Sequence, residues 1–279
     1  MKNNYTVLFI AMSGVRVKDD ELLRLGMTLP GFVERSEVIA SLPSLSLLTL
    51  AAHNLGNWDS RYIDVDEVTD NVKKELLAID ADLIAISTFT ARAYDTYNLS
   101  DYLMKSGACV VLGGLHVSVL PNEAKSHANA IVVGQAEIVW PNLLRDYESG
   151  NLQKIYNQSE YQSYSIKNSK IPRYDLIDIS KYNRITIQTS RGCPLNCTFC
   201  AASKLISPYQ LKPIDHIERE LETIFKIWNR PFIELADDNT FVNKKWSKDL
   251  LRLFRKYPMK WFTESDISIA DDTELLELL

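Results

Sequence analysis

The sequence is 279 residues long, carries a formal net charge of -5 at pH 7 and is 46% hydrophobic. This length accommodates roughly two domains, and the hydrophobic content is sufficient for packed cores. The chain is acidic and has no long Lys/Arg block, so it lacks the electrostatic signature of a nucleic-acid binder. The longest nearly apolar run, residues 42–52, contains Pro43 and serines and is too short to span a bilayer. The composition therefore predicts a soluble protein with a small-molecule substrate and with neither a nucleic-acid nor a membrane partner.

The first half of the chain alternates strand and helix patterns. Strands are predicted at residues 6–12, 61–65, 82–87, 109–112 and 130–133. Helical segments are predicted at residues 41–53, 68–79, 91–106, 122–127 and 136–149. This alternation predicts an α/β fold in which five βα units form a doubly wound, flavodoxin-like, five-stranded parallel sheet. Such sheets bind ligands at the carboxyl ends of their strands, so the loops after the strands are the candidate site.

Small and polar residues fill four of these loops. They are Ser13-Gly14, Ser87-Thr88, Gly113-Gly114 with the nearby His116, and Gly134. A glycine after a strand often serves only the turn into the next helix. A lone histidine is more often a surface residue or a satisfied core residue than a ligand. The residues by themselves leave a structural and a ligand-binding interpretation open.

The second half predicts a different domain. Residues 151–183 are polar and tyrosine-rich, contain Pro172 and lack clear periodicity, which predicts a linker between domains at 1–150 and 184–279. Strands are predicted at residues 184–189, 232–236 and 259–263, and an amphipathic helix runs from Ile214 to Trp228. These patterns predict about three βα units, which is an incomplete (β/α) barrel.

Polar residues follow the second and third strands of this domain. Asp237 and Asp238 come after the second strand, and Glu264 and Ser265 come after the third. Residues at strand ends face the site in barrels. The alternative for the aspartates is that they cap the helix predicted at residues 241–257. The spaced oxygen ligands and central glycine of an EF-hand calcium loop are absent from this stretch.

Three cysteines follow the first strand of the second domain. Cys193, Cys197 and Cys200 have the spacing C-x3-C-x2-C, which lets one loop offer three thiolates to one inorganic centre. A four-iron cluster normally takes four thiolates, so three leave one iron open for a small molecule. A structural zinc site would need a fourth ligand, and the nearest candidate, His216, lies in a helical pattern. With no signal peptide and only Cys109 besides, a reduced cytoplasmic compartment is expected and a disulfide is disfavoured.

These residues resemble the cobalamin (B12)-binding radical S-adenosylmethionine (SAM) family, and the resemblance covers nearly the whole chain. The cysteine loop is similar to the family's cluster motif. The resemblance implies a 4Fe-4S cluster on the three cysteines, with SAM bound to the open iron. It further implies Phe199 beside the adenine, Asp237 and Asp238 at the amino group, and Glu264 and Ser265 at the ribose.

The first domain resembles the cobalamin-binding domain of the same family. Ser87-Thr88-Phe89 takes the place of its Ser-x-Leu, and Gly113-Gly114 takes the place of its Gly-Gly. The resemblance implies cobalamin contacts from Ser13, Gly14, Ser87, Thr88, Gly113, Gly114, His116 and Gly134. Many cobalamin domains carry a cobalt-ligating histidine in the first loop, whereas the stretch from Ser13 to Asp19 contains none, so cobalamin is expected without that ligand. A flavodoxin-like sheet without a cofactor is the alternative.

The resemblance implies an enzyme that forms a 5′-deoxyadenosyl radical and transfers a methyl group to an unactivated carbon of a small molecule. Cyclisation or rearrangement is a second outcome. A truncated or split cofactor-binding protein without turnover of its own is a third. Because barrels of this family normally have six βα units, the incomplete barrel predicts self-association or a partner chain that completes it.

Overall fold

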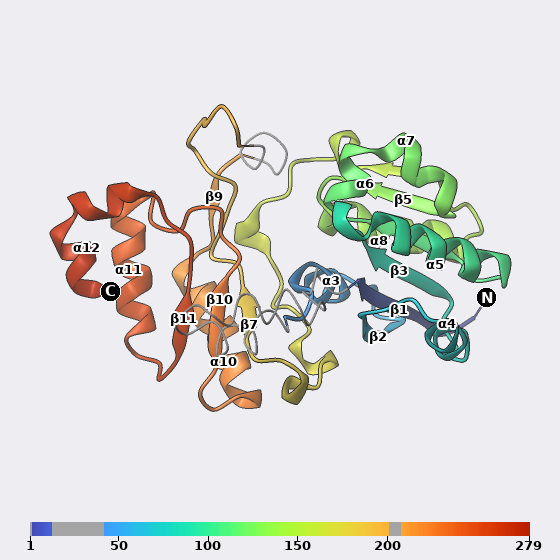
Figure 1. Ribbon diagram of the computed structural model, residues 1–279, viewed down its shortest axis with the longest axis horizontal. Helices are drawn as coiled ribbons and strands as arrows, with labels where there is room; N and C mark the ends of the chain where they lie inside the picture. The colour runs from blue at the N-terminus through green and yellow to red at the C-terminus, as the bar shows by residue number, and fades with distance from the viewer. Residues whose placement is uncertain (1, 13–41, 201–207) are drawn as a thin grey trace, which may run out of the picture. The chain divides into compact units, whose positions relative to one another are not determined.

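The computed structural model describes residues 2–12, 42–200 and 208–279 of the chain (Figure 1). Contacts divide these residues into two compact units. The amino-terminal unit comprises Met1–Ser163 and Asp175–Asn183, and the carboxyl-terminal unit comprises Tyr164–Tyr174 and Arg184–Leu279. The chain between the two units therefore enters the second unit, returns to the first and enters the second again.

The amino-terminal unit is built on a parallel six-stranded sheet in the order β2-β1-β3-β4-β5-β6. Its strands are β1 (Tyr5–Met12), β2 (Trp58–Val65), β3 (Leu83–Ser87), β4 (Val110–Gly113), β5 (Ala130–Val133) and β6 (Ile155–Asn157). The order of the first five strands is that of flavodoxin-like folds. The predicted α/β class is confirmed.

The predicted number of five strands is wrong, because β6 was missed. It arises inside the predicted linker 151–183 and has three residues, of which only Tyr156 is buried. Such a short strand shows no alternation in the sequence. It forms because Ile155 and Asn157 align in parallel with Ile131 and Val133 of β5.

Helices cover both faces of this sheet, because successive strand residues point to opposite sides. In β1, Val7 and Phe9 join one buried cluster, whereas Leu8 and Ile10 join another. The first cluster includes residues of α3 (Leu45–Ala51) and α8 (Ala136–Glu148). The second includes residues of α4 (Asp70–Leu77), α5 (Ala93–Lys105), α6 (Leu115–Val119) and α7 (Pro121–Ala124). The sheet is therefore doubly wound.

The carboxyl-terminal unit contains a three-stranded parallel sheet in the order β11-β10-β7. Its strands are β7 (Ile185–Ile187), β10 (Phe232–Leu235) and β11 (Lys260–Phe262), and a separate antiparallel pair consists of β8 (Ser190–Arg191) and β9 (Gln210–Leu211). Its helices are α10 (Ile214–Ile227), α11 (Lys244–Phe254) and α12 (Thr273–Leu278), and Figure 1 shows α11 beside α12. Among the helices in the described parts of the chain, none combines the length and apolarity needed to cross a membrane.

Short 3-10 turns complete both units. They lie at Thr90–Arg92, Lys125–His127, Gln158–Glu160, Ile166–Asn168, Tyr174–Leu176, Ile179–Lys181 and Ile267–Asp271. Helix α11 begins later than predicted, because the Asn243 side chain caps it by accepting the backbone N–H of Trp246 at 3.1 Å. The cap of α11 is therefore Asn243, and neither Asp237 nor Asp238 has this role.

Candidate functional site

Three of the predicted loops meet at the carboxyl edge of the amino-terminal sheet. The backbone N–H of Thr88 donates to the carbonyl of Gly113 at 2.9 Å. Gly114 has a φ of +102°, and a Cβ at this position would lie 2.8 Å from the Thr88 carbonyl oxygen, so only glycine permits this close packing. The Ser118 hydroxyl donates to the Gly114 carbonyl and accepts the N–H of Gly134, each at 2.9 Å. The loops after β3, β4 and β5 are thus joined at one edge.

Thr88 places a buried hydroxyl at this edge. The residue is 1% exposed, and its Oγ1 has no hydrogen-bond partner among the described residues. Ser87 beside it is also buried. A buried hydroxyl without a partner is costly, so an acceptor or donor from a bound molecule would stabilise this position. The edge therefore fits a ligand slot.

His116 is engaged within its own unit. Its Nδ1 lies 3.3 Å from the hydroxyl of Thr90, and its Nε2 lies 3.0 Å from the hydroxyl of Tyr97 and 3.2 Å from Oε1 of Glu123. The hydrogen bond with His116 lowers the pKa of Glu123. Because both ring nitrogens have partners, contact with a cofactor would require His116 to leave this network.

The first predicted loop cannot be placed in the slot, because Ser13 and Gly14 lie outside the described residues. His53, which follows α3, is buried, and its Nδ1 lies 3.0 Å from the carbonyl oxygen of Thr49. The predicted residues that the structure does bring together are Ser87, Thr88, Gly113, Gly114 and Gly134.

The cysteine loop of the second unit is closed at its base by β8 and β9. Ser190 pairs with Leu211, and Arg191 pairs with Gln210. Gly192 follows with a φ of +71°, which turns the chain into the cysteine segment. Near the end of this segment, the backbone N–H of Cys200 donates to the carbonyl of Cys197 at 3.2 Å. The antiparallel strands β8 and β9 thus hold the two ends of the loop together.

The described structure does not gather the three thiols around one point. Within residues 2–12, 42–200 and 208–279, no three His, Cys, Asp or Glu side chains are grouped so that they could hold a metal ion. Cys193, Cys197 and Cys200 are free thiols and partly exposed. Thiolates are the donors that iron-sulfur clusters and zinc prefer. The donor set therefore fits a cluster by its chemistry, and its ligating geometry stays a prediction.

Asp237 anchors the start of the cysteine loop, at Thr189 and Ser190. Its Oδ1 accepts the backbone N–H groups of Thr189 at 2.7 Å and Ser190 at 2.9 Å. Its Oδ2 accepts the hydroxyls of Thr189 and of Thr240, the latter at 3.0 Å. Burial raises the pKa of Asp237 in spite of these four hydrogen bonds. Because a carboxylate offers about four acceptor positions, contact with SAM would have to displace one of these donors.

The other predicted SAM residues are accessible. Asp238 is exposed and accepts a hydrogen bond from the backbone of Gly192, while desolvation raises its pKa. Glu264 and Ser265 follow β11 and are exposed, and the Glu264 carbonyl accepts the N–H of Thr240 at 3.2 Å. Parallel strands place Asp238, Glu264 and Ser265 at the same edge as the cysteine loop. Phe199, within that loop, is 91% exposed.

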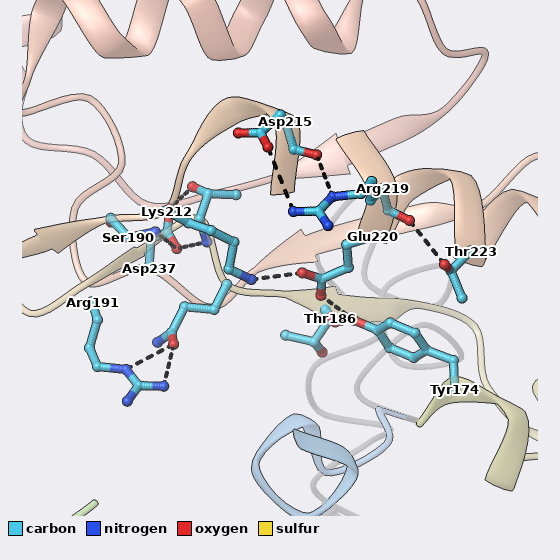
Figure 2. A network of polar contacts seen from close by, with 12 residues as sticks. Tyr174, Thr186, Ser190, Arg191, Lys212, Asp215, Arg219, Glu220, Thr223 and Asp237 are labelled. Atoms are coloured by element: carbon cyan, nitrogen blue, oxygen red, sulfur yellow. Dashed lines mark hydrogen bonds and ion pairs between the residues drawn. The ribbon is translucent and has the colours of Figure 1, made fainter. Parts of the chain in front are cut away.

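A buried polar network that the sequence did not predict supports the end of the cysteine loop. Nζ of Lys212 lies 2.7 Å from Oε2 of Glu220, and the hydroxyl of Tyr174 donates to Oε1 of Glu220 at 2.6 Å. Figure 2 shows Glu220 between Lys212 and Tyr174. Lys212 directly follows β9, and its backbone N–H donates to the carbonyl of Thr189 at 2.9 Å. The network therefore connects the end of the loop to helix α10.

One signal in the sequence marks this network. Glu220 falls between Ile217 and Ile224 on the apolar face of α10, where all three side chains are buried. A charged residue at such a position needs a buried partner of opposite charge. The sequence did not show that Lys212 and Tyr174 supply the partners.

Comparison with known proteins supports the family resemblance predicted from the sequence. The B12 binding domain family matches residues 37–144. The chain is 29% identical over 217 residues to a bacteriochlorophyllide d C-8(2)-methyltransferase of Chlorobaculum tepidum, with 72% of this chain and 47% of that protein covered. It is 24% identical over 281 residues to an anaerobic magnesium-protoporphyrin IX monomethyl ester cyclase of Cereibacter sphaeroides, with 87% and 46% covered.

A solved structure has the same fold over nearly the whole chain. The radical SAM methyltransferase TsrM of Kitasatospora setae, with cobalamin and a 4Fe-4S cluster bound, matches with a TM-score of 0.63 and 14% identity. The match covers 99% of this chain and 55% of TsrM. The chain spans about half the length of the curated relatives that it matches. The resemblance to cobalamin-binding radical SAM proteins is confirmed by these matches.

Proposed function

We propose that this chain, which carries a B12 binding domain match and a three-cysteine loop, is the cofactor-binding part of a cobalamin-dependent radical SAM methyltransferase. Residues 1–150 hold cobalamin, and residues 184–279 hold a 4Fe-4S cluster and SAM. One observation carries the proposal. A flavodoxin-like sheet with joined glycine loops and a cysteine loop at the end of a parallel strand occur in one chain.

The residues at the edge of the first sheet bind and orient cobalamin in this proposal. The buried hydroxyl of Thr88 is free to donate a hydrogen bond, and the absence of a side chain at Gly113 leaves room beside the backbone. Because the His116 nitrogens are engaged with Thr90, Tyr97 and Glu123, His116 supports the loop from within the unit. The expected state is therefore cobalamin without a histidine ligand.

The residues of the second unit hold the cluster and SAM. Cys193, Cys197 and Cys200 supply the thiolates, while Asp237 anchors the start of their loop at Ser190. The exposed side chain of Asp238 is the better placed of the two aspartates to meet the amino group of SAM. When bound, the cluster with SAM supplies a 5′-deoxyadenosyl radical and cobalamin supplies a methyl group.

The proposed reaction is methyl transfer to an unactivated carbon of a small molecule. A ring closure is the second candidate, because the similarity to the cyclase of Cereibacter sphaeroides covers 87% of the chain. SAM with a deuterated methyl group separates the two. Methyl transfer moves the label into the product, whereas ring closure does not.

The outer edge of the second sheet offers a place for a further strand. Among the residues that the structure describes, β11 is the edge strand of the order β11-β10-β7, and its Phe262 is 47% exposed. Uncovered strand edges readily pair with other strands. We propose that a further strand, from a second copy of this chain or from a partner chain, pairs with β11, and light scattering of the 279-residue chain distinguishes self-association from a monomer.

Anaerobic reconstitution with iron, sulfide and hydroxocobalamin tests the proposal. The expected product contains one oxygen-sensitive four-iron cluster and one cobalamin per chain. After reduction, the cob(II)alamin electron paramagnetic resonance (EPR) spectrum is expected to lack nitrogen splitting from an axial imidazole. Zinc in place of iron would overturn the cluster assignment. A chain that does not retain cobalamin would overturn the assignment of the first unit.

A further inference from the structure

Two buried hydroxyls lie where the cysteine loop begins and where it ends. Oγ of Ser190 and the phenolic oxygen of Tyr209 are enclosed and have no hydrogen-bond partner among the described residues. Ser190 precedes Cys193 by three positions, and Tyr209 directly precedes β9. Buried hydroxyls without partners are rare because desolvation without a hydrogen bond is costly. Each hydroxyl is therefore evidence for a bound group that supplies a hydrogen-bond acceptor.

The register of β8 and β9 places both hydroxyls on one face of the pair. Ser190 is opposite Leu211, and side chains alternate along a strand, so Tyr209 lies on the same side as Leu211 and Ser190. Arg191 and Gln210, which are also paired, lie on the other side.

The other face is covered by protein. The Gln210 amide donates to the carbonyl of Tyr164 at 3.1 Å, and its Oε1 accepts the N–H of Ile166 at 3.0 Å. The guanidinium of Arg191 lies 5.5 Å from the centre of the Tyr164 ring. The two faces thus differ, because one packs against residues 164–166 and the other carries the two hydroxyls.

The hydroxyl-bearing face lies at the start of the cysteine loop, where Ser190 precedes Cys193 by three positions. The backbone N–H of Ser190 donates to Asp237, and Figure 2 shows these two residues beside each other. Burial, together with the charges of Asp237 and Cys193, raises the pKa of Tyr209 to about 12. Tyr209 therefore retains its proton at neutral pH, so it is a hydrogen-bond donor.

We propose that Ser190 and Tyr209 donate hydrogen bonds to sulfur atoms of the cluster held by Cys193, Cys197 and Cys200, and that they thereby raise its reduction potential. The inference rests on the proposed function, because it requires the cluster. The reduced cluster carries one more negative charge than the oxidised cluster. Donors to its sulfur atoms therefore stabilise the reduced form more strongly.

An EPR-monitored redox titration of the reconstituted chain without SAM tests this inference. Ser190→Ala and Tyr209→Phe are each expected to lower the equilibrium constant for one-electron reduction by about tenfold, which is about 59 mV for this couple. The double variant is expected to show a larger shift. Tyr164→Phe is the matched control, because it removes the same group from the other side of the hairpin, and its potential is expected to equal that of the wild type.

The outcomes separate this inference from the proposed function. A wild-type chain that assembles no cluster overturns the proposed function and this inference together. Wild-type potentials in both single variants overturn only the inference. The reduced wild-type cluster gives a second readout that needs no variant, because hydrogen bonds to its sulfur atoms produce exchangeable-proton couplings that disappear in deuterated water. Absence of those couplings also overturns the inference.

Discussion

Lys212 and Glu220 form a buried ion pair at the base of the cysteine loop. Nζ of Lys212 lies 2.7 Å from Oε2 of Glu220, and the two side chains are 5% and 3% exposed. Tyr174, whose pKa burial raises well above its usual value, donates a hydrogen bond to the other carboxylate oxygen. Because each charge is removed from water, each depends on the other to offset its desolvation.

Removal of one partner is expected to destabilise the carboxyl-terminal unit. Lys212→Met leaves the Glu220 charge buried and uncompensated, which costs about 3–5 kcal/mol in comparable cases. The double variant Lys212→Met/Glu220→Gln removes both charges, keeps an acceptor for Tyr174 and is expected to recover most of the loss. Urea unfolding of the single and double variants measures the difference.

The exposed pair on the same helix is the matched control for this experiment. Arg219 lies 3.6 Å from Asp215, with side chains 54% and 74% exposed (Figure 2). Exposed pairs contribute roughly 0–1 kcal/mol, so Arg219→Met is expected to have little effect. Equal losses in Lys212→Met and Arg219→Met would show that burial of the first pair has no special role.

The two adjacent glycines at the end of β4, Gly113 and Gly114, are expected to respond differently to substitution. At Gly114, a φ of +102° and a Cβ 2.8 Å from the Thr88 carbonyl oxygen make Gly114→Ala destabilising by roughly 2 kcal/mol or more. At Gly113, a Cβ would lie 3.8 Å from Cβ of Val132, which is an ordinary contact. Gly113→Ala is therefore expected to keep the stability of the wild type in urea unfolding.

This difference makes Gly113 the informative position for cobalamin. Loss of binding in Gly114→Ala would report only that the packing of the loops is disturbed. Gly113→Ala leaves the loops intact. It is expected to weaken cobalamin binding about tenfold or more, because the new methyl group fills the space beside the backbone that the cofactor approaches. An unchanged affinity in equilibrium dialysis would place the cofactor elsewhere on this edge.

The four cysteines are expected to divide into three ligands and one spectator. Alanine at Cys193, Cys197 or Cys200 is expected to abolish the four-iron cluster, as measured by iron and sulfide analysis. Cys109→Ala is the control, because burial raises the pKa of Cys109 to about 11 and keeps that thiol protonated at neutral pH. A full iron content in Cys197→Ala would contradict the assignment, and so would loss of iron in Cys109→Ala.

Asp266 is expected to contribute stability that depends on pH. Its pKa is lowered to about 2 by hydrogen bonds from the hydroxyl of Ser268, from the amide of Asn239 at 2.6 Å and from the N–H of Ser268 at 2.7 Å. A depressed folded-state pKa means that the contribution is present above the unfolded value near 4 and is lost as the pH falls toward 2.

The variant Asp266→Asn removes this titration. The difference in unfolding free energy between wild type and variant is therefore expected to favour the wild type above about pH 4 and to shrink as the pH approaches 2. A difference that does not change between these pH values would show that Asp266 is not the titrating group.

The sequence by itself determined the features that depend on residues close together along the chain. The cysteine spacing places three thiols in one short loop in any fold that turns there. The alternation of Val7 and Phe9 with Leu8 and Ile10 predicts a strand buried on both faces, and the structure confirms two helix layers around it. These signals are local because strand and helix periods repeat within a few residues.

Only the tertiary structure decided which polar groups find partners, because those partners are far apart in the sequence. Thr189 and Asp237 are separated by 48 positions, and Tyr174 and Glu220 by 46. The same reason explains β6, which becomes a strand only when β5 lies beside it. It also explains His116, whose ring nitrogens are engaged by Thr90, Tyr97 and Glu123. A hydrogen bond is directional and short, so whether a buried group has a partner is decided by the packing of distant segments.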